Sequence, residues 1–465
     1  MKISINNFKS IGSLANYEMR PLTILSGTNS SGKSSFIQLL LLLKQTLEID
    51  SSQRPLDLDG RLFKVRNYLD IIKEKNKENK LNIEFVFDKP ELEPYKYFHE
   101  ISFYDAAFDD YNLQLTVEFD SSDNQMFVSH FGVKFTAQNK ENFIQFENNS
   151  KSFDIKTNVA VFSEKLYGKS YKIKKINYSS FIPSDYEIEF DDGGTSKEVP
   201  KLEGIKQLLK DVLTNLNYIG PLRKEPQDSY SINGNKNSVG VSGENVADVL
   251  YGLSESSISY FIIDEREEGV DFIQKEDLFL DAVKYWLCNK FQLCSDIYLR
   301  KEAESYIIYI KSFEGIESTI KHVGFGISQV LPIIVEGLRL LSNETLIIEQ
   351  PEIHLHPKIQ SSLSDFFIAM TKQGKKVIIE THSDHLITRL RRRIAEDQTN
   401  QLDNKTLLTF VEVGDKDVLF KNIFINDFGI LELPYPDDFI ERTDVELKAI
   451  LKAQMKKRLN KKEEE

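Results

Sequence analysis

The residues best suited to chemistry are the eight from Gly27 to Ser34, Gly-Thr-Asn-Ser-Ser-Gly-Lys-Ser. A short apolar stretch, 22–25, precedes them, and an apolar run with helical character, 36–43, follows. A strand, a glycine-rich loop and a helix in this order are typical of phosphate-binding loops, in which backbone N–H groups point at phosphate oxygens. The pattern therefore predicts a site for ATP or GTP.

Each polar group of this loop has an expected part in binding. Lys33 is expected to reach the β- and γ-phosphates, and the Ser34 hydroxyl to ligate Mg²⁺. The predicted nucleotide-binding residues here are Gly27, Asn29, Ser30, Ser31, Gly32, Lys33, Ser34 and Ser35. The predicted cofactors are ATP and Mg²⁺.

The second half of the chain carries polar groups at the ends of two apolar strands. Glu349 ends the stretch 345–349, and His382 follows the stretch 377–380. Strand and helix patterns alternate here, so we expect a mainly parallel sheet whose carboxyl-terminal ends bring the P-loop, Glu349 and His382 together. Glu349 and Ser34 are the predicted metal residues, and His382 is expected to hydrogen-bond the γ-phosphate or the attacking water.

The same region allows a second interpretation, a transition-metal hydrolase. His354 and His356 form an H-x-H pair, and His382 and His385 are three residues apart at the start of a predicted helix. Imidazoles near carboxylates are common ligands of such metals. This interpretation leaves both the P-loop and a glycine-rich turn at 324–329 unexplained, so the nucleotide site is favoured.

Charge and composition limit the class of protein. The 465 residues carry a net charge of −13, so contact with DNA requires a local basic patch or a partner. The candidate patch is Arg389, Arg391, Arg392 and Arg393, for which a solvated helix face or a set of salt bridges is the favoured explanation. No apolar run is long enough to span a membrane, and the two cysteines, in apolar surroundings, indicate a reducing cytoplasm.

Patterning changes along the chain. From residue 81 to about 190, apolar and polar residues alternate as in half-buried antiparallel strands. The stretch 275–293 has the spacing of an amphipathic helix, and 443–459 is also predicted to be helical. These changes place a β-rich insert at 81–215 and a C-terminal helical region at 426–465.

Five short motifs carry a resemblance to a known family. They are Asn7-Phe8-Lys9-Ser10, the P-loop, Gly324-Phe325-Gly326-Ile327-Ser328-Gln329, the run Ile348 to Pro357, and Glu380-Thr381-His382-Ser383. Together they resemble the ABC-type ATPase heads of the RecF, SMC and overcoming-lysogenization-defect kind. The run Ile-Glu-Gln-Pro-Glu-Ile-His-Leu-His-Pro is similar to the Walker B of bacterial ATPases that include the Septu-type anti-phage ATPases.

This resemblance implies an α/β fold with a mixed, largely parallel sheet. The head would consist of 1–80, carrying the Walker A P-loop, and 216–425, carrying the signature, Walker B and switch histidine His382. It also implies a homodimer, with higher oligomers open, in which two ATP molecules are sandwiched. Each ATP would contact the P-loop of one subunit and Gly324, Gly326 and Ser328 of the other.

Gln350 departs from the family pattern, because many ABC heads place the catalytic glutamate at this position. An amide cannot accept the proton of the attacking water. Either Glu352 or Glu349 takes that role, or hydrolysis is slow and the ATP-bound dimer long-lived. The predicted catalytic residues are Glu349, Gln350, Glu352 and His382, and slow turnover is expected.

Relatives of this kind often work beside a nuclease. About eighty residues follow His385, without an acidic cluster of TOPRIM character, so a nuclease is expected on a separate subunit, of the HNH type, as part of anti-phage defence. DNA contact would be direct or through that partner. The alternative is a DNA-repair or SMC-like clamp that binds DNA itself; a transporter subunit ranks last.

Overall fold

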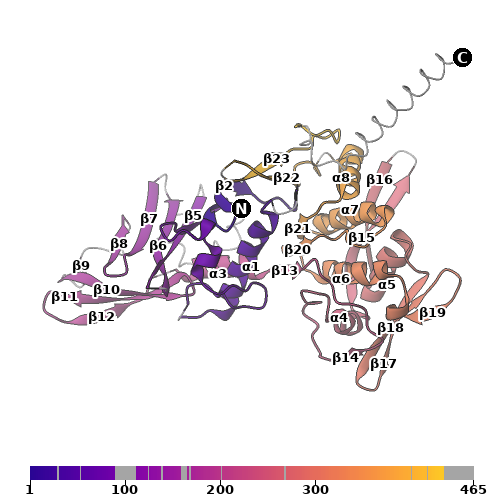
Figure 1. The fold of residues 1–465 in the computed structure, drawn as a ribbon, viewed down its shortest axis with the longest axis horizontal. Coiled ribbons are helices and arrows are strands. Elements are labelled where there is room, and N and C mark those ends of the chain that lie inside the picture. The colour runs from indigo at the N-terminus through magenta and orange to yellow at the C-terminus, as the bar shows by residue number, and fades with distance from the viewer. Residues whose placement is uncertain are drawn as a thin grey trace, which may run out of the picture.

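A six-stranded sheet forms the centre of the molecule (Figure 1). The computed structural model describes residues 1–28, 31–52, 54–88, 112–123, 125–137, 140–158, 165–166, 169–200, 202–266, 269–399, 401–415 and 417–433. In spatial order the central strands are β13 (Leu216–Ile219), β20 (Thr345–Glu349), β21 (Lys376–Glu380), β3 (Leu22–Gly27), β22 (Thr406–Val413) and β23 (Val418–Ile423). The first five are parallel, and β23 runs antiparallel to β22.

Alternate side chains of the central strands enter two different cores. In β20, Leu346 and Ile348 belong to one apolar core, and Ile347 belongs to the other. The same alternation occurs in β21 and β22. A sheet that is covered on both faces has near-continuous apolar strands, which is why these segments were recognisable in the sequence.

Helices cover the two faces of this sheet. On one face lie α1 (Lys33–Ile49) and α3 (Glu203–Thr214). The other core is built from α4 (Val246–Leu253), α5 (Phe279–Lys284), η5 (Tyr285–Lys290), α6 (Phe325–Arg339), α7 (Pro357–Lys372) and α8 (Asp384–Glu396). Figure 1 shows β20 and β21 between α1 and α3 on the left and α6 and α7 on the right. Three short turns of helix are η1 (Tyr68–Ile71), η2 (Lys73–Lys75) and η6 (Ile320–His322).

A seven-stranded antiparallel sheet extends to the left in Figure 1. Its order is β2 (Ile11–Glu18), β1 (Lys2–Phe8), β4 (Leu81–Asp88), β5 (Asn112–Ser122), β6 (Gln125–Ala137), β7 (Lys140–Asn148) and β8 (Phe153–Thr157). Because β4 pairs directly with β1, the predicted boundary at residue 81 falls inside one continuous sheet. The β-rich region therefore extends the sheet that the first residues of the chain begin.

Three smaller sheets complete the described fold. One contains β9 (Lys165–Leu166), β10 (Lys169–Ser179), β11 (Ile182–Phe190) and β12 (Thr195–Glu198). The second contains β14 (Tyr230–Ser231), β17 (Asp296–Glu302), β18 (Ser305–Lys311) and β19 (Glu317–Thr319). The third is the hairpin of β15 (Ser257–Arg266) and β16 (Gly269–Leu278).

The structure confirms the predicted fold class, an α/β fold with a largely parallel sheet and added antiparallel strands. It corrects the predicted helix at 275–293, because Lys275 to Leu278 belong to β16 and pair with β15, and the helix begins only at Phe279. Residues 434–465, which include most of the predicted C-terminal helical region, lie outside the described residues. Among the described helices, none is long and apolar enough to cross a membrane.

Candidate functional site

The P-loop connects the end of β3 to the start of α1, as predicted. Gly27 has a φ of 144°, and a Cβ there would collide with the carbonyl oxygen of Val411 in the neighbouring strand. Gly32 has a φ of 99°, and a Cβ there would lie 2.6 Å from the Ser10 hydroxyl oxygen. Both positions require glycine for conformation and for space. Asn29 and Ser30, two predicted nucleotide-binding residues, lie outside the described residues.

Lys33 lies inside the loop. Only 3% of the residue is exposed, and its ammonium group donates to the carbonyl oxygens of Gly27 at 3.1 Å and Thr28 at 2.7 Å. Burial lowers the lysine pKa, while Glu380 and Glu352 act in the opposite direction. The charge is therefore held at the point where the loop backbone turns.

The two serines after Lys33 face different neighbours. The Ser34 hydroxyl donates to both carboxylate oxygens of Glu380, at 3.0 and 3.2 Å. The Ser35 and Ser10 hydroxyl oxygens are 2.8 Å apart, so the Asn7-Phe8-Lys9-Ser10 motif packs directly against the P-loop helix. Ser31 is fully buried.

Glu349 lies one strand further from the P-loop than Glu380. It ends β20 and pairs in register with Glu380 at the end of β21, and β21 in turn pairs with β3. Its carboxylate accepts a hydrogen bond of 2.8 Å from the Tyr218 hydroxyl of β13. The structure thus brings Ser34 to Glu380, and brings Glu349, the predicted metal partner of Ser34, to Tyr218.

The buried carboxylates interact. Burial raises the pKa of Glu349 to about 7, and the neighbouring charge of Glu380 adds to this shift. Burial also raises the pKa values of Glu380 and Glu352. Three acidic groups with raised pKa values beside a buried lysine mark this edge of the sheet as the candidate active site.

The backbone after β20 is held in an unusual conformation. Gln350 has a φ of 45°, and its N–H donates to the Glu380 carbonyl oxygen at 2.7 Å. The Arg223 guanidinium, which is 8% exposed, donates to the carbonyl oxygens of Glu349 at 3.2 Å and Gln350 at 3.4 Å. Two long-range contacts therefore fix the position of the loop that follows β20.

Glu352 has one engaged and one free carboxylate oxygen. Its Oε1 accepts from the backbone N–H of His382 at 2.6 Å. Its Oε2 is buried and has no hydrogen-bond partner among the described residues. Partial burial of the His382 imidazole and the positive charge of Lys33 both lower its pKa. The structure therefore places Glu352 and His382 together, within electrostatic reach of Lys33.

The glycine-rich turn at the start of α6 is exposed at Gly324 and Phe325 and buried from Ile327 onward. Around a Cβ placed on Gly324 nothing lies within 4 Å, and on Gly326 the nearest atom is Leu355 Cδ2 at 3.7 Å. The Phe325 ring packs edge-on against His354, with ring centroids 5.6 Å apart. Ser328 is 6% exposed and its hydroxyl donates to the Phe325 carbonyl oxygen at 2.8 Å. No hydrogen bond between described residues joins this turn to the P-loop of the same chain.

The rival transition-metal site is not assembled. Among the residues that the structure describes, no three His, Cys, Asp or Glu side chains are grouped so that they could hold a metal ion. His356 instead caps α7, accepting from the Lys358 N–H at 3.3 Å. His354 packs on Phe325, as described above. The first histidine pair lies in the loop that leads into α7, and the second lies around the start of α8.

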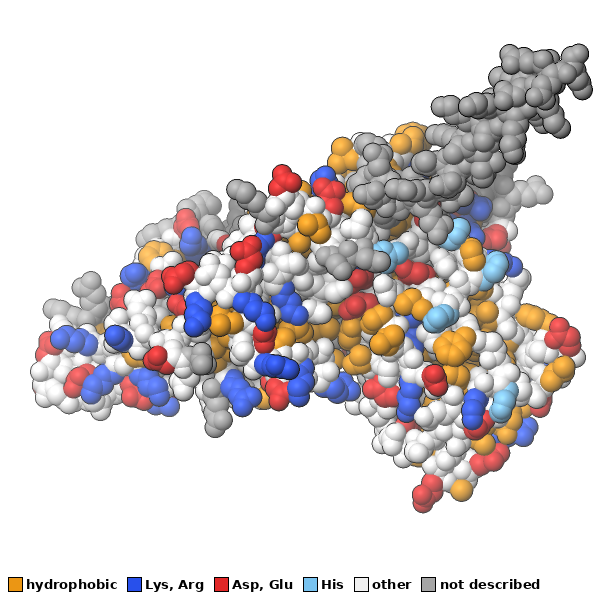
Figure 2. All heavy atoms as spheres, in the orientation of Figure 1, with side chains coloured by type: hydrophobic (Ala, Val, Ile, Leu, Met, Phe, Trp, Pro, Cys, Tyr) orange, Lys and Arg blue, Asp and Glu red, His pale blue; other side chains and the backbone are white. Residues whose placement is uncertain are grey.

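The arginine cluster in α8 is largely used within the fold, as expected. Arg393 is 2% exposed and its Nε donates to Asp365 at 2.6 Å. Arg392 donates to Glu396 at 2.7 Å, and Arg391 to the Gly429 carbonyl oxygen at 2.9 Å. On the face shown in Figure 2, basic and acidic side chains are interspersed over the left half of the molecule. Arg389 and Arg393 thus pair with the buried Asp365, Arg391 bonds a backbone carbonyl, and Arg392 is exposed but paired with Glu396, which is the pattern of intramolecular contacts that the sequence favours.

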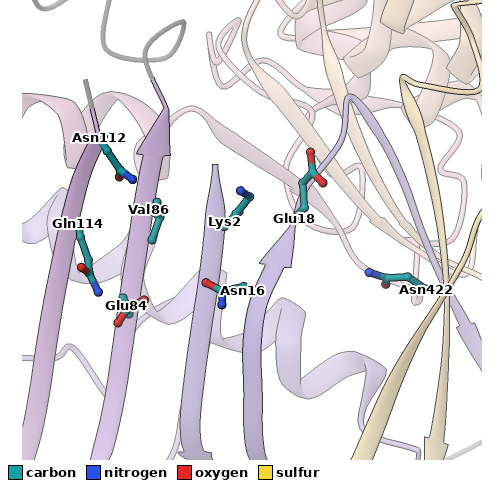
Figure 3. Close-up of a pocket in the computed structure, with 8 residues that line it drawn as sticks. All are labelled: Lys2, Asn16, Glu18, Glu84, Val86, Asn112, Gln114 and Asn422. Atoms are coloured by element: carbon teal, nitrogen blue, oxygen red, sulfur yellow. The ribbon is translucent and has the colours of Figure 1, made fainter. Parts of the chain in front are cut away.

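A separate concavity of about 630 Å³ lies on the outer face of the antiparallel sheet (Figure 3). It is lined by Lys2, Asn16, Glu18, Glu84, Val86, Asn112, Gln114 and Asn422. Nearly all of these side chains are polar, and they occupy the solvent-facing positions of their alternating strands. Sites for small ligands are usually mostly apolar, so this surface does not compete with the P-loop edge as the active site.

A P-loop at the end of β3 and buried carboxylates at the ends of the next two strands, β21 and β20, define a P-loop nucleotide-binding protein. Residues 1–387 match the family described as AAA ATPase domain, and the chain belongs to this family. It is accordingly an ATP-binding ATPase. No curated protein matches the chain.

Solved structures that resemble the chain include SMC heads. A Smc head bound to the C-winged-helix domain of ScpA is 11% identical, with a TM-score of 0.43, and the match covers 91% of this chain and 97% of that one. The SMC head domain from Thermotoga maritima is 9% identical, with a TM-score of 0.37 and coverage of 90% and 97%. A Smc head with an extended coiled coil, bound to the C-terminal domain of ScpA derived from Pyrococcus furiosus, is 10% identical, with a TM-score of 0.40 and coverage of 91% and 96%.

Three contacts were missed at the sequence level: Ser34 with Glu380, Tyr218 with Glu349, and Arg223 with the loop that follows β20. Glu380 ends an apolar strand just as Glu349 does, and that signal could have identified it. Tyr218 lies in the short strand β13 and Arg223 in the turn after it, a segment without a recognisable chemical motif. Their role depends on β13 lying beside β20, which no local pattern predicts.

Proposed function

We propose that this ATPase binds ATP with Mg²⁺ in the P-loop and hydrolyses it slowly. The observation that carries the proposal is the hydrogen bond from Ser34 of the P-loop to the buried Glu380 carboxylate at the end of β21, with the buried Lys33 within electrostatic reach of the same carboxylate. The loop N–H groups and the start of α1 favour the negative charge of phosphates. Lys33 would exchange its carbonyl partners for the β- and γ-phosphate oxygens.

The donor set fits magnesium. Ser34, Glu380 and Glu349 offer hydroxyl and carboxylate oxygens, which are the hard ligands that Mg²⁺ prefers. A bound Mg²⁺ ion would neutralise charge on the phosphate oxygens. The excess of buried carboxylates over buried cations here also favours a divalent cation, since like charges raise the pKa values of these groups.

Glu352 is the side chain best suited to accept the proton of the attacking water. Gln350 carries an amide and cannot do so, and Glu349 is engaged by Tyr218. Glu352 has a free oxygen, and its raised pKa makes it a stronger base once ionised. His382, whose backbone holds Glu352, would orient the γ-phosphate. Because this base is not at the position next to Glu349, we expect turnover to be slow.

We further propose a head-to-head dimer around two ATP molecules, with the turn at 324–329 of each subunit contacting the ATP of the other. The open space around Gly324 supports this arrangement, since it leaves the turn accessible to a partner. The motif resemblance supports a regulatory role, in which the ATP-bound dimer controls a separate nuclease subunit in anti-phage defence. Slow turnover suits such a long-lived state.

The test is a co-expression experiment with the neighbouring genes of the source genome. We expect ATP to be bound and slowly hydrolysed by the wild type but not by Lys33→Ala, and a nuclease to co-elute with the wild type. ATP-dependent, salt-sensitive DNA binding by the chain alone, with no co-eluting nuclease, would instead make it a repair-type clamp. Absence of ATP binding by the wild type would refute the proposal.

A further inference from the structure

Two carboxylates, Glu380 and Glu349, are candidates for acting on the metal ion that accompanies ATP. Their strands lie at different distances from the P-loop strand β3. Glu380 ends β21, the strand that pairs directly with β3. Glu349 ends β20, which pairs with the far side of β21. Neighbouring strands are roughly 4.8 Å apart, so Glu349 begins from a backbone about 10 Å from β3 and Glu380 from one about half as far.

We propose that Glu380 positions the Ser34 hydroxyl for the magnesium ion that accompanies ATP, and that Glu349 does not. This inference rests on the proposed ATP site. The Ser34 hydroxyl already donates to both oxygens of Glu380, at 3.0 and 3.2 Å, whereas Glu349 accepts from Tyr218 on the opposite side. Each carboxylate thus has its own hydroxyl partner, and only one of these hydroxyls belongs to the P-loop.

If the Ser34 hydroxyl binds a cation, its proton needs a hydrogen-bond acceptor. A serine hydroxyl has one proton and two lone pairs, and a cation binds through a lone pair. The proton must then point elsewhere, and Glu380 takes it. With the proton fixed on Glu380, the lone pairs of Ser34 are directed away from β21. Glu380 is 5% exposed, so water competes little for this hydrogen bond.

A purely structural role for Glu380 makes a different prediction. The carboxylate lies next to the first turn of α1, where negative charge stabilises a helix through its dipole. Loss of that contribution alone would lower thermal stability and weaken nucleotide binding equally with and without Mg²⁺. A positioning role acts only when the cation is present.

The experiment measures the affinity of the purified full chain for a fluorescent ATP analogue, in Mg²⁺ and in EDTA. We expect Glu380→Gln to keep the affinity seen in EDTA and to lose the gain that Mg²⁺ provides to the wild type. Groups that orient a metal ligand typically change metal affinity by roughly 10–100-fold, so the half-saturating Mg²⁺ concentration should rise by about that factor. The matched variant is Glu344→Gln, the same change just before β20, at the opposite end of that strand from the nucleotide site, which should keep the Mg²⁺ gain in affinity.

A double variant tests whether Glu380 acts through Ser34. In a Ser34→Ala background, Glu380→Gln should cause no further loss of the Mg²⁺ gain. Additive losses, an unchanged Mg²⁺ response in Glu380→Gln, or equal losses in EDTA and Mg²⁺ would each overturn the inference while ATP binding by the wild type stands. If the wild type binds the analogue in neither condition, the proposed ATP site itself is wrong.

Discussion

Gln350 combines two features that together affect hydrolysis. Its backbone is left-handed, with a φ of 45°, and its side chain is an amide next to the buried carboxylate of Glu349. The conformation is held by contacts to the backbone, from Glu380 and Arg223, so the side chain can be changed without removing them. A substitution of Gln350 therefore tests whether the missing general base limits the rate of ATP hydrolysis.

We expect Gln350→Glu to raise kcat by roughly tenfold or more, because a positioned general base contributes on the order of a hundredfold or more to such reactions. In that background Glu352→Gln should have little effect, whereas in the wild type it should abolish turnover. Steady-state phosphate release measures both. An unchanged kcat in Gln350→Glu, with ATP affinity intact, would show that proton removal is not the slow step.

The Glu349 carboxylate makes stability depend on pH. Its pKa is raised from 4.5 to about 7 in the folded chain, so between these values the folded state binds more protons than the unfolded state. Stability therefore falls as pH rises through this window, which corresponds to roughly 3 kcal/mol at most. We expect Glu349→Gln, which stays neutral, to melt at a higher temperature than the wild type at pH 8. At pH 5 the difference should be much smaller, as measured by differential scanning fluorimetry.

At the scale of elements, the edge strand β13 and the turn after it support the active site from outside. Tyr218 donates to the Glu349 carboxylate, and Arg223 donates to the backbone carbonyl oxygens of Glu349 and Gln350. Both belong to one short segment, so displacement of this segment would move the loop that follows β20. The nucleotide site is thus completed by residues that lie far from the P-loop in sequence.

Arg223→Lys should lower kcat roughly tenfold with little change in KM. A lysine ammonium lacks the planar fork that reaches two carbonyl oxygens, and one lost hydrogen bond from a charged donor costs about 1.5–3 kcal/mol. The neighbouring exposed residue Lys224 provides the control, and Lys224→Ala should leave both constants unchanged. A change in KM alone would argue for direct contact of Arg223 with the nucleotide.

Elements with strong local signals were predictable from the sequence. The strand, loop and helix around Lys33 and the apolar strand ending at Glu349 are where the pattern places them. The contact between Ser34 and Glu380 was not, because it depends on β21 lying between β20 and β3, and strand order is decided by packing. The predicted helix at 275–293 failed for a similar reason, since pairing with β15 draws Lys275 to Leu278 into a strand.

At the scale of the whole molecule, the glycine-rich turn is separate from the P-loop of its own chain. Gly324 is exposed and has a φ of −55°, so a larger side chain there meets neither strain nor steric conflict in the monomer. If the turn contacts the ATP of a second subunit, a bulky residue would affect only the dimer. A substitution of Gly324 therefore tests dimer assembly without disturbing folding or ATP binding.

We expect Gly324→Arg to keep the melting temperature and the ATP affinity of the wild type, but to remain monomeric with ATP and to lose hydrolysis. Light scattering after size exclusion measures the oligomeric state, and it is performed in the Glu352→Gln background, in which turnover should be abolished, so that ATP persists. Phe313→Arg is a matched control, because Phe313 is 63% exposed in the turn between β18 and β19 and should not affect assembly. A Gly324→Arg chain that still dimerises with ATP would mean that the turn lies outside the interface. A wild type that stays monomeric would mean that the site works within one chain, and His354 and Leu355, which border the turn, would then be the residues to examine for contact with the nucleotide.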